Sequence, residues 1–362
     1  NLNSNSIKIM STVSSSLLAC PDVQAELTSY FQSCGHASFV RESPFLQMVT
    51  SAENTSGINQ IVNPGGAKTR TVVLRYDQKI PVSAVEEVNS CDIECTATTK
   101  RGDASAEYSM DICNKIKVEE GWNVYDLANI CRTNEQFLTS RINAMASAIE
   151  EKLAQKTAEE AVALVGNWAS DVADVTGDVL QVATKQTGGV NVNPYFLPKI
   201  TLAAKQTGYC SPIGIFGGSE LYLSTDMLNV GCCVDAGFDL MGVMQRYGKS
   251  VSWDPYVISA FGSDNISLMT QLGALQMLVF TLGSEAGFSP IASASASNFE
   301  ILPLVTPRYG IPFDLVVSNN CGTLSLIATT STKLVGMPTD MFPTGDALDG
   351  VTFANIIEVV NP

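Results

Sequence analysis

The sequence predicts an α+β fold organised around one long helix. Residues 133–166 run without a proline or an internal glycine, and apolar side chains recur in them at helical spacing. Residues 92–112 instead alternate strictly between apolar and polar, as a strand with one buried face does. The last fifty residues are again strand-like. Because helix and strand patterns occupy separate stretches, the α+β class is favoured.

The long helix begins with a capping-box pattern, since Gln136 follows Thr133 at three residues. An apolar stripe runs along it, made of Leu138, Ile142, Met145, Ile149, Leu153, Ala161 and Val165. Glutamate and glutamine side chains are expected to keep the other faces wet, namely Glu150, Glu151, Gln155 and Glu159. Gly166 is expected to close the helix, which would be roughly 45 Å long. It is either a surface helix across a sheet or a structural spine.

Residues 92–99 and 104–112 predict a β-hairpin that turns at Arg101-Gly102. In this register Cys95 faces Tyr108 and Ile93 faces Met110, so both apolar sets share one face. A two-stranded ribbon is marginal alone in water, and the strand 69–76 is a candidate third member. We expect the apolar face and the tip to contact a neighbouring subunit. The expected contact residues are Ile93, Cys95, Ala97, Arg101, Gly102, Asp103, Tyr108 and Met110.

The remaining segments are predicted more coarsely. Residues 1–66 begin polar, contain a short amphipathic helix at 22–31, and are expected to form an arm. Strands are expected at 178–184, 250–253, 313–317, 324–328 and 353–359, and helices begin at Ser219 and Asp235. Residues 194–198 are expected to be a loop, 208–218 a glycine-rich turn with buried isoleucines, 271–283 a buried helix and 292–297 a loop.

Composition excludes some classes of function. The net charge of −15 argues against a nucleic-acid reader, which would cluster Lys and Arg against phosphates. Only 16% of the residues are charged, so much surface is expected to be buried, internally or against partners. The apolar run 272–282 is too short to span a bilayer, and no secretory signal is expected at the start.

The sequence offers no residues for an enzyme. His36 is the only histidine, and the ten cysteines are scattered without a paired C-x-x-C, which disfavours a zinc site and favours reduced thiols. No phosphate-binding, dinucleotide-binding or nucleophile-elbow motif is present, and 214–218 is expected to be a tight turn rather than an anion cradle. We therefore expect no catalytic residue, no cofactor and no metal ion.

The order of arm, hairpin, long helix, helical region and returning strands resembles the major capsid proteins of tailed bacteriophages, the Hong Kong 97-type fold shared with encapsulins. Two segments are similar to phage capsid sequences in detail: 239–248, which leads into Trp253-Asp254, and 273–278. The resemblance implies an N-terminal arm (1–66), an E-loop (67–125), a P-domain with a spine helix (126–206), an inserted A-domain (207–310) and P-domain return strands (311–362).

The resemblance also implies a function. Subunits would join into hexamers and pentamers of an icosahedral shell that encloses double-stranded DNA without reading its sequence. Scaffolding, portal and decoration proteins would be partners, and the protein would be assembled in the host cytoplasm and reside in the virion. In the family type member E-loop lysines form isopeptide bonds, for which Lys68, Lys79 and Lys100 are in the right region, although no motif here assigns such a bond.

Three alternatives remain open. An encapsulin-type compartment would share the fold and would enclose a cargo enzyme instead of DNA. An adhesive module would use Arg101-Gly102-Asp103, although glycine at a hairpin tip is ordinary turn chemistry. A metabolic α+β enzyme would need a pocket of perturbed acids, which the sequence does not locate.

Overall fold

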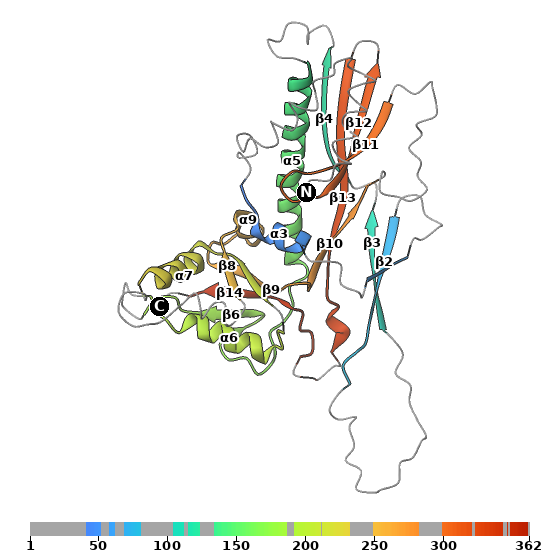
Figure 1. Ribbon diagram of the computed structural model, residues 1–362. Helices are drawn as coiled ribbons and strands as arrows, with labels where there is room; N and C mark the ends of the chain where they lie inside the picture. The colour runs from blue at the N-terminus through green and yellow to red at the C-terminus, as the bar shows by residue number, and fades with distance from the viewer. Residues whose placement is uncertain are drawn as a thin grey trace, which may run out of the picture. The chain divides into compact units, whose positions relative to one another are not determined.

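The computed structural model shows a chain that is mixed helix and strand, so the predicted α+β class is confirmed (Figure 1). The residues described are 41–51, 58–61, 69–80, 104–111, 115–123, 134–186, 192–210, 212–231, 249–281, 299–320, 323–342, 346 and 348–360. They form two compact units. The first holds Asp111–Lys156 and Leu278–Lys333, and the second holds Ser43–Met110, Thr157–Met277 and Leu334–Pro362. The chain therefore passes from one unit to the other several times.

The first unit is built on the start of the long helix and a sheet of long strands. The helix is α5 (Asn134–Val162), and the sheet runs in the order β10-β13-β12-β11, with β4 also paired to β13. The strands are β4 (Ile116–Asn123), β10 (Leu275–Phe280), β11 (Phe299–Val305), β12 (Pro312–Asn320) and β13 (Thr323–Gly336). Leu315, Leu326 and Ala328 are buried and alternate with half-buried residues, because successive side chains of a strand point to opposite faces of the sheet.

Polar contacts fix α5 to the loops of the first unit. The Glu150 carboxylate accepts hydrogen bonds from the backbone N–H groups of Arg308 (3.0 Å) and Tyr309 (3.3 Å). Lys156 Nζ donates to the carbonyl of Thr332 at 2.8 Å. Trp122 packs edge-on against Phe137, with ring centroids 5.3 Å apart. These contacts set the position of the helix along the sheet as well as its distance from it.

The second unit contains a six-stranded sheet in the order β5-β6-β14-β9-β7-β8. Its strands are β5 (Val175–Thr176), β6 (Val179–Val182), β7 (Ile213–Gly217), β8 (Lys249–Ser252), β9 (Ile266–Gln271) and β14 (Ala354–Val359). Helices α3 (Pro44–Ser51), α6 (Phe196–Gln206), α7 (Ser219–Gly231) and α9 (Pro255–Phe261) belong to the same unit. The strand β14 pairs parallel with β6 and antiparallel with β9, so the C-terminal strand lies inside this sheet.

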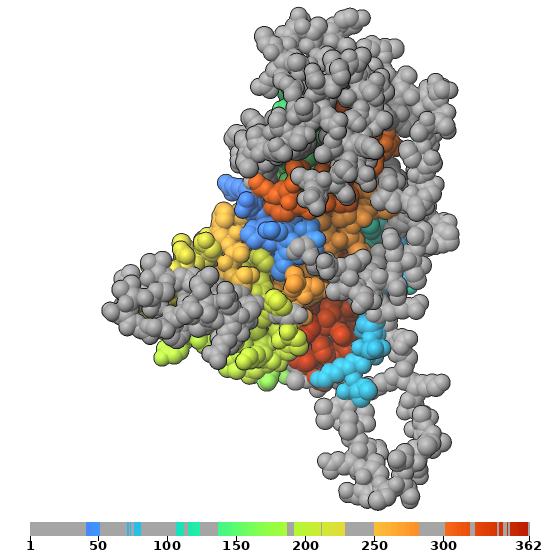
Figure 2. Space-filling model, in the orientation of Figure 1, coloured from blue at the N-terminus to red at the C-terminus, as the bar shows by residue number. Residues whose placement is uncertain are grey.

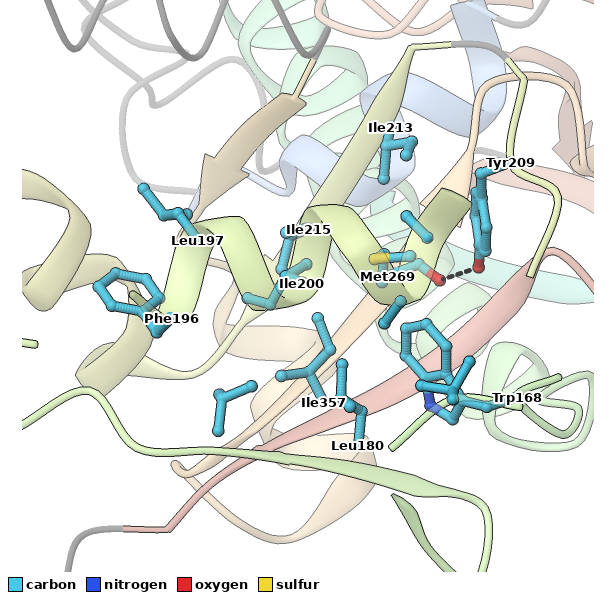
Figure 3. Packing of buried hydrophobic residues seen from close by; sticks show 14 of the residues in the cluster. Trp168, Leu180, Phe196, Leu197, Ile200, Tyr209, Ile213, Ile215, Met269 and Ile357 are labelled. Atoms are coloured by element: carbon cyan, nitrogen blue, oxygen red, sulfur yellow. Dashed lines mark hydrogen bonds between the residues drawn. The ribbon is translucent and has the colours of Figure 1, made fainter. Parts of the chain in front are cut away.

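The core of the second unit lies between α6 and this sheet. Figure 3 shows Ile200 of α6 pointing toward Ile215 of β7 and Ile357 of β14, and all three are fully buried. Tyr209 brings a hydroxyl into the core, where it donates to the carbonyl of Met269 and to the side chain of Asn355. Burial raises the pKa of Tyr209 well above its usual value, so the group stays neutral. The buried hydroxyl is therefore satisfied rather than a reactive group.

Several predicted elements are confirmed. The long helix occupies 134–162, with Met145, Ile149, Leu153 and Ala161 buried as the stripe requires. The strand predicted at 69–76 is β2 (Thr69–Tyr76), and α7 begins at Ser219 as expected. The strands predicted at 178–184, 250–253, 313–317, 324–328 and 353–359 correspond to β6, β8, β12, β13 and β14. The helices expected at 22–31 and after Asp235, the loop at 292–297, and the capping residue Thr133 lie outside the described residues.

Other predictions are wrong. The sequence predicts a helix at 271–283, but the described residues 271–281 do not form one. A turn with Gly273 at φ +85° leads into the strand β10, because pairing with β13 outweighs the helix preference of Leu and Met. Residues 194–198 are not a loop throughout, since α6 begins at Phe196 and tolerates Pro198 in its first turn. The region 208–218 contains the fully buried strand β7 rather than turns alone.

Two single residues of the long helix also behave differently from the prediction. Glu150 does not face solvent: its side chain is only 2% exposed, because the carboxylate accepts hydrogen bonds from the backbone of the 308–309 turn. Gly166 does not close the helix, which ends at Val162. A Cβ at Gly166 would lie 2.8 Å from the backbone nitrogen of Thr352, so glycine is needed there for a close approach of two backbone segments.

Candidate subunit-contact ribbon

The strand that carries the predicted contact residues Tyr108 and Met110 belongs to a three-stranded sheet in the order β1-β2-β3. Its members are β1 (Ile58–Ile61), β2 and β3 (Ala104–Asp111), and β1 pairs antiparallel with β2. The expected third member of the hairpin sheet, 69–76, is therefore present and lies beside β3. We call β2 and β3 the ribbon. Its partner strand predicted at 92–99 lies outside the described residues.

The ribbon buries one face, as the alternation predicts. Along β3 Met110 is buried and Tyr108 half-buried, whereas Glu107, Ser109 and Asp111 are exposed. On β2 Val73 is buried. A one-residue shift in register would turn the apolar set of β3 outward, so the observed phase is the one that the sequence specifies.

Hydrogen bonds fasten the end of β2 to a segment more than 250 residues later in the chain. The hydroxyl of Tyr76 donates to the carboxylate of Asp340 in the short helix η4 (Thr339–Met341). Gln78 donates from its amide to the carbonyl of Asp340 at 3.2 Å, and the backbone N–H of Lys79 donates to the carbonyl of Met341 at 3.0 Å. Figure 2 shows residues 76–80, in cyan, lying against the red residues of this segment.

An ion pair and a second tyrosine complete this attachment. Lys79 Nζ lies 2.9 Å from each carboxylate oxygen of Asp346, and its ammonium group also lies 5.9 Å from the ring centroid of Phe342. On the neighbouring strand, the hydroxyl of Tyr108 donates to the carbonyl of Gly336 at 2.7 Å. Both ribbon strands are thus held by one C-terminal segment, 336–346.

The electrostatics of the attachment keep the hydroxyl groups of both tyrosines protonated. Partial burial and the hydrogen bond to Asp340 raise the pKa of Tyr76 to about 12. Burial, with a smaller effect of the Asp340 charge, raises the pKa of Tyr108 as well. Both phenols therefore remain neutral hydrogen-bond donors near neutral pH. Within the described part of the chain no group of three or more His, Cys, Asp or Glu residues could hold a metal ion.

The structure describes two of the eight predicted contact residues. Tyr108 and Met110 lie on β3, and their side chains belong to the anchored ribbon. Ile93, Cys95, Ala97, Arg101, Gly102 and Asp103 lie outside the described residues, so their contact role stays a prediction. The sequence reasoning missed Asp340 and Asp346, which hold the ribbon. It considered Lys79 only for a covalent cross-link, whereas here its ammonium group binds Asp346.

Comparisons with known proteins were made for the whole chain. No protein-family model matches it, and no curated protein matches it. Solved phage capsids are what this chain is similar to. The capsid structure of cyanophage P-SCSP1u matches at 11% identity over 90% of each chain, with a TM-score of 0.44. The capsid of Myoviridae phage XM1 matches at 11% identity over 83% of this chain and 90% of that one, with a TM-score of 0.39.

A chain from a structure of Mycobacterium phage Adephagia is similar at 14% identity, over 89% of this chain and 92% of that chain, with a TM-score of 0.42. None of the helices in the described ranges has the length and apolar character that a membrane span requires.

Proposed function

We propose that this chain is the major capsid protein of a tailed bacteriophage and assembles into an icosahedral shell around double-stranded DNA. The observation that carries the proposal is the path of the chain. The ribbon precedes α5, the strands β7 to β9 follow it in the second unit, and the chain then adds β11, β12 and most of β13 to the sheet of the first unit that contains β4. This is the order that the resemblance implies for an E-loop, a spine helix, an inserted domain and return strands.

The ribbon supplies the physical basis for assembly. A ribbon of two strands is marginal in water on its own, so its apolar face needs cover from another part of the chain or from another subunit. Hydrogen bonds and an ion pair to residues of the segment 336–346 fix the position of the ribbon relative to the C-terminal part of the same subunit. We propose that the face carrying Ile93, Cys95 and Ala97 is covered by a neighbouring copy. Contacts of this head-to-tail kind close into rings, and many weak contacts per subunit add up to a stable shell.

The charge of the chain fits an enclosing role. A net charge of −15 repels the phosphates of packaged DNA, so the inner wall would contain the genome without binding it tightly. Within this proposal, the domain boundaries stated for the sequence remain predictions. Scaffolding, portal and decoration proteins are proposed partners, as a closed shell must be initiated, filled and stabilised.

Negative-stain electron microscopy of the purified full-length chain tests the proposal. Hollow shells built from rings of five and six subunits are expected, and a small discrete oligomer at every concentration would refute it. Particles isolated from the producing cells should protect DNA from nuclease. Particles that enclose a protein and no DNA would favour the encapsulin-type alternative.

A pair of variants tests the contact surface separately. Ile93→Asp places a charge on the proposed contact face and should abolish shells while the circular dichroism spectrum is unchanged. Leu202→Asp places the same charge on α6, where the side chain is already exposed, and should leave assembly intact. Normal shells from Ile93→Asp would show that this face is not a subunit contact.

A further inference from the structure

The outer face of α7 carries apolar side chains that nothing in the described residues covers. Leu223 is 54% exposed and Met227 is 59% exposed, and Tyr222 beside them is also exposed. The opposite face of the helix, with Leu221 and Leu228, is buried in the core of the second unit. α7 is therefore apolar on two faces, although a surface helix normally presents a polar face to water.

Trp253 extends this surface beyond the helix. Its indole N–H donates to the hydroxyl of Ser219 at 3.1 Å, and the ring is 41% exposed. Ser219, Leu223 and Met227 are spaced at four residues and lie along one line of α7. Trp253, Leu223, Met227 and the adjoining Tyr222 are the exposed apolar residues of this face, which also carries the exposed Asp226; we call the four apolar residues the α7 stripe.

The start of α3 is bound through Asp254 to the segment that carries Trp253. The Ser43 hydroxyl donates to the carboxylate of Asp254 at 2.7 Å, and the backbone N–H of Phe45 donates to the same carboxylate at 3.1 Å. Asp254 is the residue after Trp253, so the start of α3 is bound to the residue that follows Trp253 in the chain. Figure 1 shows α3 beside α9, the helix that Asp254 caps. The first forty residues must begin their course from this point.

The length and pattern of that segment fit the stripe. Eleven residues, 32–42, separate the amphipathic helix predicted at 22–31 from Ser43 (42 − 31 = 11). Eleven residues span up to roughly 36 Å, whereas α7 is only about 20 Å long, so the predicted helix can reach every part of the stripe. Its apolar side chains, Val23, Leu27, Tyr30 and Phe31, recur at spacings of three and four and would lie on one face.

We propose that residues 22–31 dock as a helix on the α7 stripe of their own chain. Docking would cover Leu223, Met227 and Trp253 with an apolar helix face. A short tether gives such a segment an effective concentration of about 1 mM, which exceeds that of free copies in a micromolar solution. This intramolecular contact goes beyond the proposed shell function and does not depend on it.

Hydrogen exchange read by mass spectrometry tests the docking on the full-length unassembled chain. Amides of residues 22–31 should exchange at least about tenfold more slowly than in an unstructured peptide. The double variant Leu223→Gln, Met227→Gln should remove this protection while β7 and β9 remain protected. Leu202→Gln is the matched control, because Leu202 is 59% exposed on α6, outside the stripe. The control should keep the protection of 22–31.

Dilution distinguishes two possible occupants of the α7 stripe, residues 22–31 of the same chain and a second copy of the protein. Protection of 22–31 that is unchanged on tenfold dilution supports the proposal. Exchange of 22–31 at the unstructured rate in the native chain would overturn it. So would protection of α7 that falls on dilution while 22–31 stays unprotected, because a second copy would then cover the stripe. Loss of protection in the Leu202→Gln control would also overturn it.

Discussion

Asp254 is a single buried carboxylate that begins two helices, and its replacement should be unusually costly. One oxygen accepts from the backbone N–H groups of Tyr256 (3.0 Å) and Val257 (3.2 Å), which caps α9. The other accepts from Ser43 and Phe45 at the start of α3. A helix cap contributes about 1 kcal/mol, and each buried donor left unpaired costs a further 1–3 kcal/mol or so.

We therefore expect Asp254→Ala to lower the free energy of unfolding by about 3–5 kcal/mol. Asp254→Asn keeps one oxygen and should lose about half as much, because an amide cannot accept from both helices. Urea unfolding of dispersed subunits measures the total loss, and hydrogen exchange in 44–51 measures the local loss at α3. Ser43→Ala is the matched variant that weakens only the α3 side. A loss below about 0.5 kcal/mol for Asp254→Ala would refute the two-helix role.

The pH dependence of this site has a definite sign. Burial raises the pKa of Asp254, although four hydrogen bonds oppose the rise. The folded state therefore holds the proton to a higher pH than the unfolded state, in which the pKa is about 3.9. The stability of the native protein relative to Asp254→Asn should fall as pH rises from about 4 toward the raised pKa. A difference that grows with pH over this range would contradict the assignment.

Three further predictions concern single contacts. Glu150→Ala leaves two backbone N–H groups without their acceptor and should cost about 2–4 kcal/mol in urea unfolding, whereas Glu151→Ala on the exposed face should change stability by less than about 0.5 kcal/mol. Gly166→Ala should lower the free energy of unfolding by about 1–3 kcal/mol, because the added Cβ would collide with the backbone of Thr352. Gly121→Ala is the control: its Cβ would lie 3.7 Å from the nearest atom, so the free energy of unfolding should change by less than about 1 kcal/mol. Equal losses in urea unfolding of the two variants would refute the crowding at Gly166. Tyr76 has its pKa raised to about 12 against about 10 unfolded, so the stability of the native protein relative to Tyr76→Phe should be constant below pH 10 and fall between pH 10 and 12, as urea unfolding at pH 9 and pH 11 would show.

Local patterns predicted the elements whose periodicity is long or strict. The helix 134–162 carries an apolar stripe over eight turns, and β3 alternates at every residue, so no other element type fits either. The run 272–282 failed for the opposite reason. Apart from Gln276 and Thr281 its side chains are apolar, and such a run shows no periodicity that separates a buried helix from a fully buried strand; its length favoured the helix.

The burial and contacts of the polar residues that link distant parts of the chain could not be predicted from the neighbouring sequence. Glu150 looks like a solvent-facing glutamate in its own sequence context, and only the turn at 308–309, more than 150 residues away, shows why it is buried. The ribbon residues Tyr108 and Met110 were predicted because alternation marks a face. Their anchor Asp340 carries no pattern, since one aspartate in a short turn is indistinguishable from many others.

Because β4 pairs with β13, the sheet of the first unit cannot form until late in translation. Ile116 lies opposite Thr330, so the two strands are 214 residues apart (330 − 116 = 214). A ribosome adding about 5–20 residues per second needs roughly 10–40 s to make the intervening chain. Throughout that interval the emerged β4 has no partner strand, and an unpaired strand edge invites association with other chains. The nascent protein is thus a natural client for a chaperone until its last third has been translated.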